Sequence, residues 1–136
     1  MYQLTFDHRY SYHPTASGIE VPVSLSVAGR TVEIVTKVDT GATNCIFAHE
    51  AGDALGLHIE SGQVERFSTP NGGLFTAYGH SIQMRCLGVQ MDSLVYFAAD
   101  PAFRRNVLGR KGWLEHVRVA FIDYERLLYF ARYNQL

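Results

Sequence analysis

The sequence has no excess of charge of either sign and no long hydrophobic run. Twelve Lys and Arg residues stand against 13 Asp and Glu residues, which gives a formal net charge of −1. A nucleic acid partner requires a basic surplus, so we expect none. The uncharged apolar stretches are only a few residues long, whereas a bilayer span needs about 20. Residues 1–5 also lack the basic-then-apolar layout of a signal peptide, so we expect a soluble, cytoplasmic protein with no membrane partner.

Cysteine is scarce and the metal-binding motifs are missing. The two cysteines, Cys45 and Cys86, form no disulfide framework and show neither CxxC nor zinc-ligand spacing. We interpret both as buried thiols rather than redox groups. The six histidines form no HExxH motif, and the chain has no GxSxG, GxxxxGK[ST] or GxGxxG. We therefore expect no metal and no cofactor, and neither a serine hydrolase, a P-loop protein nor a dinucleotide-binding protein.

The size and composition favour one folded unit. The 136 residues are 47% hydrophobic and 12% aromatic, which suits a single globular domain over residues 1–136 and leaves no room for a second sizeable core. No internal repeat or low-complexity tract divides the chain.

Alternation of apolar and polar residues dominates the N-terminal third. It predicts strands over residues 19–27 and 32–38, joined at the turn 28–30 as a hairpin. Residues 2–10 alternate as well and predict a first strand, followed by a loop over 11–17. Residues 1–18 are thus an N-terminal strand and loop that precede the hairpin.

The rest of the chain shows short strands and little helix. Strand-like segments bounded by Gly, Pro, Asn or Asp cover residues 63–67, 75–78, 82–86 and 93–97, and residues 117–122 and 127–130 form a terminal hairpin around Asp123-Tyr124-Glu125. A short helix is expected from about residue 48 to residue 55, ending near Gly56, and a second at 112–116. This pattern predicts a mostly β fold, an antiparallel barrel or sandwich.

One tripeptide, Asp39-Thr40-Gly41, stands at the end of an apolar strand and is followed by Ala42. This placement puts a carboxylate at the floor of a cleft, where a glycine allows the backbone to approach closely. Taken alone, the tripeptide favours an Asp that only makes a turn hydrogen bond.

A second feature is independent of the first. Val107-Leu108-Gly109-Arg110 places two apolar residues before a glycine and leads into the helical stretch 112–116. In this order, the two motifs resemble those of the retropepsin family, the single-domain aspartic proteases of retroviruses and their bacterial and cellular relatives. The resemblance covers roughly residues 19–130, and it points to a bacterial or cellular member.

The resemblance implies a closed, barrel-like acid-protease fold and a role for each motif residue. Asp39 would be catalytic, supported by Thr40, which would hydrogen-bond across a dimer, and by Gly41 and Ala42. The loop formed by Val107, Leu108, Gly109 and Arg110 would lie beside the active site and at the dimer interface.

The resemblance also implies a flap hairpin over residues 67–78. Its substrate-binding tip would consist of Thr69, Pro70, Asn71, Gly72 and Gly73. Turn chemistry agrees, because proline presets φ and both Asn and Gly tolerate positive φ. Taken alone, these residues favour an ordinary surface hairpin.

The single Asp-Thr-Gly motif predicts a homodimer. Hydrolysis by this route needs one carboxylate to activate water and a second, protonated one beside the carbonyl oxygen. Because 136 residues cannot hold two lobes, the second Asp39 would come from another copy. We expect an aspartic endopeptidase that binds an extended peptide. The alternative is a dimerising or peptide-binding module of the same shape without turnover.

One departure from the viral pattern concerns the dimer. Viral members carry an Asp after Gly-Ala that pairs with the later Arg. Here Thr43 and Asn44 follow, so Arg110 needs another partner.

The single tryptophan, Trp113, is interpreted as core or interface packing rather than as a substrate contact.

Overall fold

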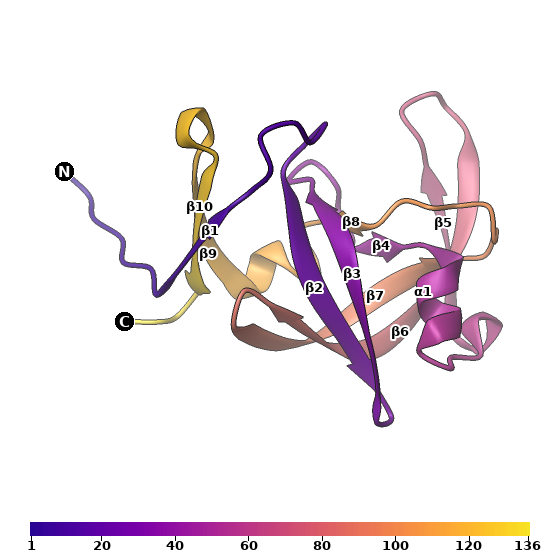
Figure 1. The fold of residues 1–136 in the computed structure, drawn as a ribbon. Coiled ribbons are helices and arrows are strands. Elements are labelled where there is room, and N and C mark those ends of the chain that lie inside the picture. The colour runs from indigo at the N-terminus through magenta and orange to yellow at the C-terminus, as the bar shows by residue number, and fades with distance from the viewer.

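The strands form two sheets in the computed structural model, which describes residues 1–136 (Figure 1). The strands are β1 (His8–Ser11), β2 (Glu20–Val27), β3 (Arg30–Val38), β4 (Ile46–Phe47), β5 (Gln63–Ser68), β6 (Leu74–Cys86), β7 (Val89–Ala98), β8 (Val107–Leu108), β9 (Val117–Ile122) and β10 (Leu127–Arg132). The helices are α1 (His49–Ala54) and the 3₁₀ turns η1 (Ile59–Ser61), η2 (Leu114–His116) and η3 (Asp123–Glu125). The mostly β class is confirmed. None of these helices has the length and hydrophobicity that a membrane crossing demands.

The larger sheet curls into a ring. Its order is β2-β3-β8-β4-β7-β6-β5, and an additional pairing of β2 with β6 joins its two sides. The closed antiparallel barrel that we expected is only partly formed, because β3–β8 and β4–β7 are parallel pairs and β5 lies outside the ring. The two-residue strands β4 and β8 are too short to leave a periodic signal, and the sequence did not predict them.

The predicted N-terminal hairpin is confirmed. Strands β2 and β3 pair in antiparallel register from Glu20 and Lys37 to Val27 and Arg30. Ala28 and Gly29 both take positive φ, at 49° and 82°, which is the backbone of a tight two-residue turn that matches strand twist. The predicted turn therefore lies where the sequence placed it.

Strand β6 corrects the sequence prediction of two separate strands, 75–78 and 82–86. It runs unbroken through Gly79, which pairs with Gln63 on one side and Tyr96 on the other. A Cβ at Gly79 would lie 3.0 Å from the Tyr96 ring. This glycine therefore makes room for an aromatic side chain on the neighbouring strand and does not mark a turn.

The predicted first strand over residues 2–10 is too long. Only His8–Ser11 pairs, against β10, in the order β1-β10-β9 of the smaller sheet. Tyr2 is 99% exposed and Leu4 64% exposed, and only Phe6 packs on a neighbour, the Tyr129 ring. Alternation without an apolar surface to cover does not make a strand. In Figure 1 the two termini lie beside this small sheet, away from the β5–β6 hairpin.

Most of the remaining predicted elements are close to those observed, but β7 begins at Val89 and not at residue 93. Strands β5, β9 and β10 and helix α1 agree with their predicted ranges within two residues. The predicted second helix is reduced to the 3₁₀ turn η2.

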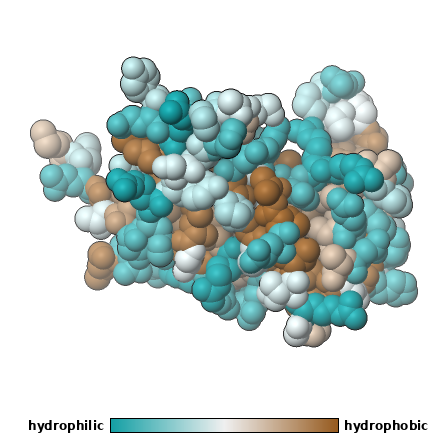
Figure 2. Space-filling model, in the orientation of Figure 1, coloured by the Kyte–Doolittle hydropathy of each residue, from teal (hydrophilic) through white to brown (hydrophobic).

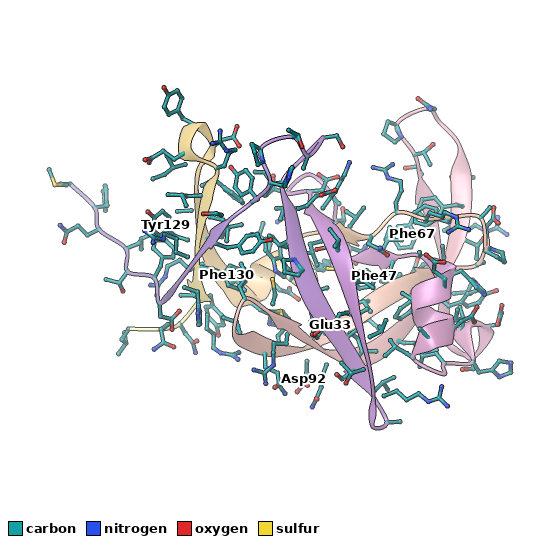
Figure 3. The ribbon with its side chains drawn as sticks, viewed as in Figure 1. Glu33, Phe47, Phe67, Asp92, Tyr129 and Phe130 are labelled. Atoms are coloured by element: carbon teal, nitrogen blue, oxygen red, sulfur yellow. The ribbon has the colours of Figure 1, made fainter.

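One core joins the two sheets. Trp113 is fully buried and stacks on Phe130 of β10, with ring centroids 5.9 Å apart, so the interpretation of Trp113 as core packing is confirmed. In Figure 3, Phe130 lies by the small sheet and Phe47 lies at the opposite end, near α1. Figure 2 shows that the surface on this side is largely hydrophilic, with hydrophobic residues near its centre. The core holds the strand ends that carry the two motifs.

Candidate active site

Asp39 follows directly on β3 and is fixed by its backbone. Its N–H donates to Leu108 O at 2.9 Å, which continues the parallel pairing of β3 with β8. Its carboxylate Oδ1 accepts the Gly41 N–H at 3.0 Å, and its carbonyl oxygen accepts the Ala42 N–H at 3.1 Å. The tight turn holds the carboxylate in one orientation, while the side chain remains exposed on the surface of the single chain.

The two predicted motifs lie side by side. After Asp39 the chain runs along the segment that follows β8: Arg110 N donates to Ala42 O at 2.9 Å, and Lys111 N donates to Thr43 O at 2.8 Å. Strand β8 itself lies between β3 and β4. The structure therefore brings Asp39, Ala42 and the Val107–Arg110 loop together.

Gly109 is the closest contact between these two loops. A Cβ built there would lie 2.3 Å from Asn44 O and 2.8 Å from Ala42 O, far inside van der Waals contact with backbone atoms. Its φ is not positive. Space, and not backbone conformation, therefore demands glycine at this position.

The side chain of Arg110 leaves this contact. It is exposed and takes part in none of the salt bridges of the chain. Its backbone is nevertheless tied at both groups, since its N–H donates to Ala42 and its carbonyl oxygen accepts the Glu115 N–H at 2.9 Å. No carboxylate of this chain pairs with Arg110 in place of the missing viral Asp.

The predicted flap is a hairpin of β5 and β6. Thr69 O accepts the Gly72 N–H at 3.0 Å, so Pro70 occupies the first central position of the turn, as predicted. Gly72 has a φ of 81°, whereas Asn71 does not take positive φ. Thr69 Oγ1 accepts the Gly73 N–H at 3.0 Å and closes the tip. In Figure 1 this hairpin projects beyond the rest of the larger sheet.

A cavity of about 350 Å³ separates the Asp39 turn from this hairpin. Of the predicted site residues, it is lined by Asp39, Gly41, Ala42, Thr69, Pro70 and Val107. Asn71, Gly72 and Gly73 do not reach it, and neither do Thr40, Leu108, Gly109 and Arg110. The first three lie at the outer end of the hairpin, and the last three support the floor from behind or beside it.

Sequence reasoning missed part of the cavity wall. Phe103 and Arg105 come from the segment between β7 and β8, where no periodic pattern or motif marks them. Phe75 stacks between two rings, Phe67 at 5.5 Å and Phe103 at 5.1 Å. Phe67 also meets the edge of Tyr96 at 5.1 Å. The only sequence signal for this wall was the pair of aromatic residues, Phe67 and Phe75, on either side of the predicted flap tip. Figure 3 labels Phe67 on the β5–β6 hairpin, where it pairs with Phe75, one pair before the turn.

The chain has no candidate metal-binding cluster. No three His, Cys, Asp or Glu side chains form a group that could hold a metal ion.

The comparisons with known proteins agree with this geometry. A family model described as "Aspartyl protease" matches residues 23–111, which includes both motifs and the hairpin. The chain belongs to this aspartyl protease family. No protein among the curated sequences matches the chain significantly.

Two solved structures have the same fold as this chain. The first is a retropepsin-like aspartic protease from Rickettsia conorii, with a TM-score of 0.60 and 19% identity over 82% of this chain and 89% of that chain. The second is EIAV protease complexed with an inhibitor, with a TM-score of 0.53 and 15% identity over 72% of this chain and 86% of that chain. The predicted retropepsin-like fold is thereby confirmed.

Both thiols of this aspartyl protease family member are buried, as predicted. Cys45 lies under the two loops, where its Sγ accepts the Gly109 N–H at 3.4 Å. Burial raises the pKa of the Cys45 thiol to about 12, and the Gly109 N–H offsets part of this rise. Burial likewise raises the pKa of Cys86 to about 12, against a smaller opposite effect of the Trp113 N–H.

We expect Gly109→Ala to destabilise the fold by about 3 kcal/mol or more, because the new methyl group meets backbone oxygens that cannot move independently. Gly18→Ala is the matched control, since a Cβ there makes only ordinary contact, at 3.7 Å from the Lys37 side chain. Urea unfolding measures both. Equal stability of the two variants would show that the loops do not depend on this contact.

We expect both cysteines to resist Ellman's reagent at pH 8 in the native protein and to react fully in urea, because the thiolate form is disfavoured in the fold. The folded thiols hold their protons more tightly than unfolded thiols, whose reference pKa is 9.0. This contribution to stability is therefore complete below about pH 9 and is lost as the pH rises toward 12. Rapid labelling of native protein would contradict the burial of the thiols.

Proposed function

We propose that this chain is an aspartic endopeptidase that acts as a homodimer, with one Asp39 from each copy forming the catalytic dyad. The observation that carries the proposal is the set of residues that line the cavity. Among the 14 residues that line it, Asp39 is the only acid. The chain supplies the floor, the cover and one carboxylate of a hydrolytic site, and the second carboxylate has to come from another chain.

The chemistry assigns different roles to two identical groups. Two carboxylates at close range do not both ionise easily, so the pair shares one proton, as is established for aspartic proteases in general. The ionised Asp39 takes a proton from water as the oxygen attacks the peptide carbonyl carbon, and the protonated Asp39 donates to the carbonyl oxygen. The tetrahedral intermediate then breaks its C–N bond as the leaving nitrogen receives a proton. No covalent enzyme intermediate forms.

The backbone around Asp39 suits this role. The Gly41 N–H donates to Oδ1 and orients the carboxylate before a substrate arrives. Asp39, Thr40 and Gly41 are exposed on the single chain, so this turn is free to meet its copy across a two-fold axis. Thr40 and Arg110 are the residues that we assign to this contact.

The small sheet has two open strand edges at which copies of the chain could make further contacts. Strands β1 and β9 each pair only with β10, so both present unpaired backbone groups at the outer edges of the small sheet. Such edges readily accept another strand.

The hairpin and the Asp39 turn support an extended peptide as the substrate. The cavity between them is bounded by the Phe67 and Phe75 side chains and by neutral polar groups from Thr43, Asn44 and Ser68. An extended backbone satisfies its hydrogen bonds against strands and turns, while alternate side chains enter pockets. Thr69 and Pro70 would contact the peptide from the hairpin side.

Asp39→Asn tests the catalytic role directly. We expect peptide-library cleavage to fall by about a thousandfold or more, because an amide cannot transfer the protons of the reaction. Light scattering should give the mass of a dimer for both wild type and Asp39→Asn. Asp92→Asn is the matched control, since Asp92 lies on β7 and does not line the cavity. Equal cleavage by wild type and Asp39→Asn would assign the activity to another site. Firm peptide binding without cleavage by wild type would favour the non-catalytic module.

Mixing the two proteins tests whether the site is shared. If each dimer uses both Asp39 side chains, a tenfold excess of Asp39→Asn chains leaves roughly a tenth of the wild-type chains paired with each other. We expect cleavage to fall roughly tenfold after equilibration. Cleavage that is unaffected by the added variant would mean that one chain contains a complete site.

A further inference from the structure

The cavity holds one cation beside its one acid. Arg105 is the only basic residue among those that line it, and the other lining residues are apolar or neutral. The reaction assigned to Asp39 needs no guanidinium group, so the proposed chemistry leaves Arg105 without a role.

Arg105 is free to bind a ligand group. It takes part in none of the salt bridges of the chain, whereas its neighbour Arg104 pairs with Glu50 of α1, Nη1 to Oε2 at 3.4 Å. The two arginines are adjacent in sequence, yet Arg104 does not line the cavity. One arginine thus contacts the chain's own carboxylate, and the next contributes its charge to the cavity.

The backbone of Arg105 is held between fixed points. On one side, Phe103 N donates to Asp100 O at 3.0 Å and the Phe103 ring stacks on Phe75. On the other side, Asn106 O accepts the Lys37 N–H at 2.9 Å, and Asn106 Oδ1 accepts the Ala48 N–H at 2.9 Å. Anchors on both sides hold the backbone of Arg105, and its exposed side chain lines the cavity, which suits a residue that selects ligands.

We propose that Arg105 determines specificity and selects peptides that carry an Asp or Glu side chain close to the cleaved bond. The proposal rests on the proposed function, in that the cavity is taken as the site of the peptide. A planar guanidinium group binds a carboxylate through two parallel hydrogen bonds, which neutral side chains cannot match.

The electrostatics of the cavity require such a cation for an acidic ligand. A dyad that shares one proton carries a negative charge, which would repel a substrate carboxylate bound nearby. Arg105 lies in the same cavity as Asp39 and offsets that repulsion. Without Arg105, acidic peptides would be disfavoured relative to their neutral counterparts.

Matched peptides test the selection. One cleaved library peptide is resynthesised with Glu or Gln at each of the four positions on either side of the cut. We expect wild type to favour Glu over Gln about tenfold in kcat/KM at one of these positions. Arg105→Gln should lower this ratio to about 1, and Arg105→Glu should favour Lys there. Arg104→Gln is the control and should retain the wild-type ratio. A wild-type ratio near 1 at every position, or a ratio unchanged in Arg105→Gln, would overturn the proposal.

A binding measurement separates this proposal from the proposed function. In the Asp39→Asn background, fluorescence anisotropy of labelled Glu and Gln peptides reports selection without turnover. Tighter binding of the Glu peptide that disappears with Arg105→Gln supports the role of Arg105, even if wild type cleaves nothing and hydrolysis is rejected. Equal binding of the two peptides, or binding of neither, would reject the role of Arg105. Thermal unfolding of each variant confirms that the fold is retained.

Discussion

The contact of Gly109 with the backbone of residues 42–44 is the constraint on which the site depends. It allows the segment after β8 to lie directly against the Asp39 turn, so that the Arg110 and Lys111 N–H groups bond to Ala42 and Thr43 carbonyl oxygens. These bonds fix the direction in which the turn leaves β3. The carboxylate of Asp39 then lines the cavity, where the Gly41 N–H holds its Oδ1. The order in the site therefore comes from two adjacent loops and not from the acid alone.

The cavity is chemically incomplete, and its composition is consistent with symmetry. One chain provides a single acid, a wall of stacked aromatic rings and a hairpin above them. A protease that used only these groups would lack a proton donor. In the proposed homodimer, the second copy would supply this donor without any new residue type, so that one short motif would encode both halves of the dyad. The same symmetry would double the aromatic wall and the arginine, and a bound peptide would meet two equivalent sides.

Sequence reasoning located the residues that obey local rules and missed those placed by tertiary contact. Ala28 and Gly29 form the tight turn that their types predict, and Pro70 takes the turn position that suits its fixed φ. Gly79 was misread as a break, because nothing in the sequence tells a glycine in a turn from one that faces the Tyr96 ring. Arg105 has no signature at all, since its importance comes only from its neighbours in the cavity.

The alternating N-terminal residues show the same limit. Tyr2 and Leu4 have the pattern of a strand but no surface to cover within the chain, and both remain exposed. Phe103 was equally hidden, because its packing partner Phe75 lies on a strand that is distant in sequence. Periodicity reports which face of a segment is apolar, and only the assembled fold decides whether that face is buried.

The length of β6 sets how far the hairpin is able to move. Strand β6 is paired with β7 from Ala77 to Cys86, and its far end is also paired with β2. The ladder to β7 ends at Ala77, and one further bond runs from the Ala99 N–H to Thr76 O at 2.9 Å, so residues 74 and 75 and their partner residues of β5 project beyond it with pairing on one side only. A peptide that enters beneath the tip would bend only this short projecting end of the hairpin. The paired strands below it and the floor that carries Asp39 would keep their register.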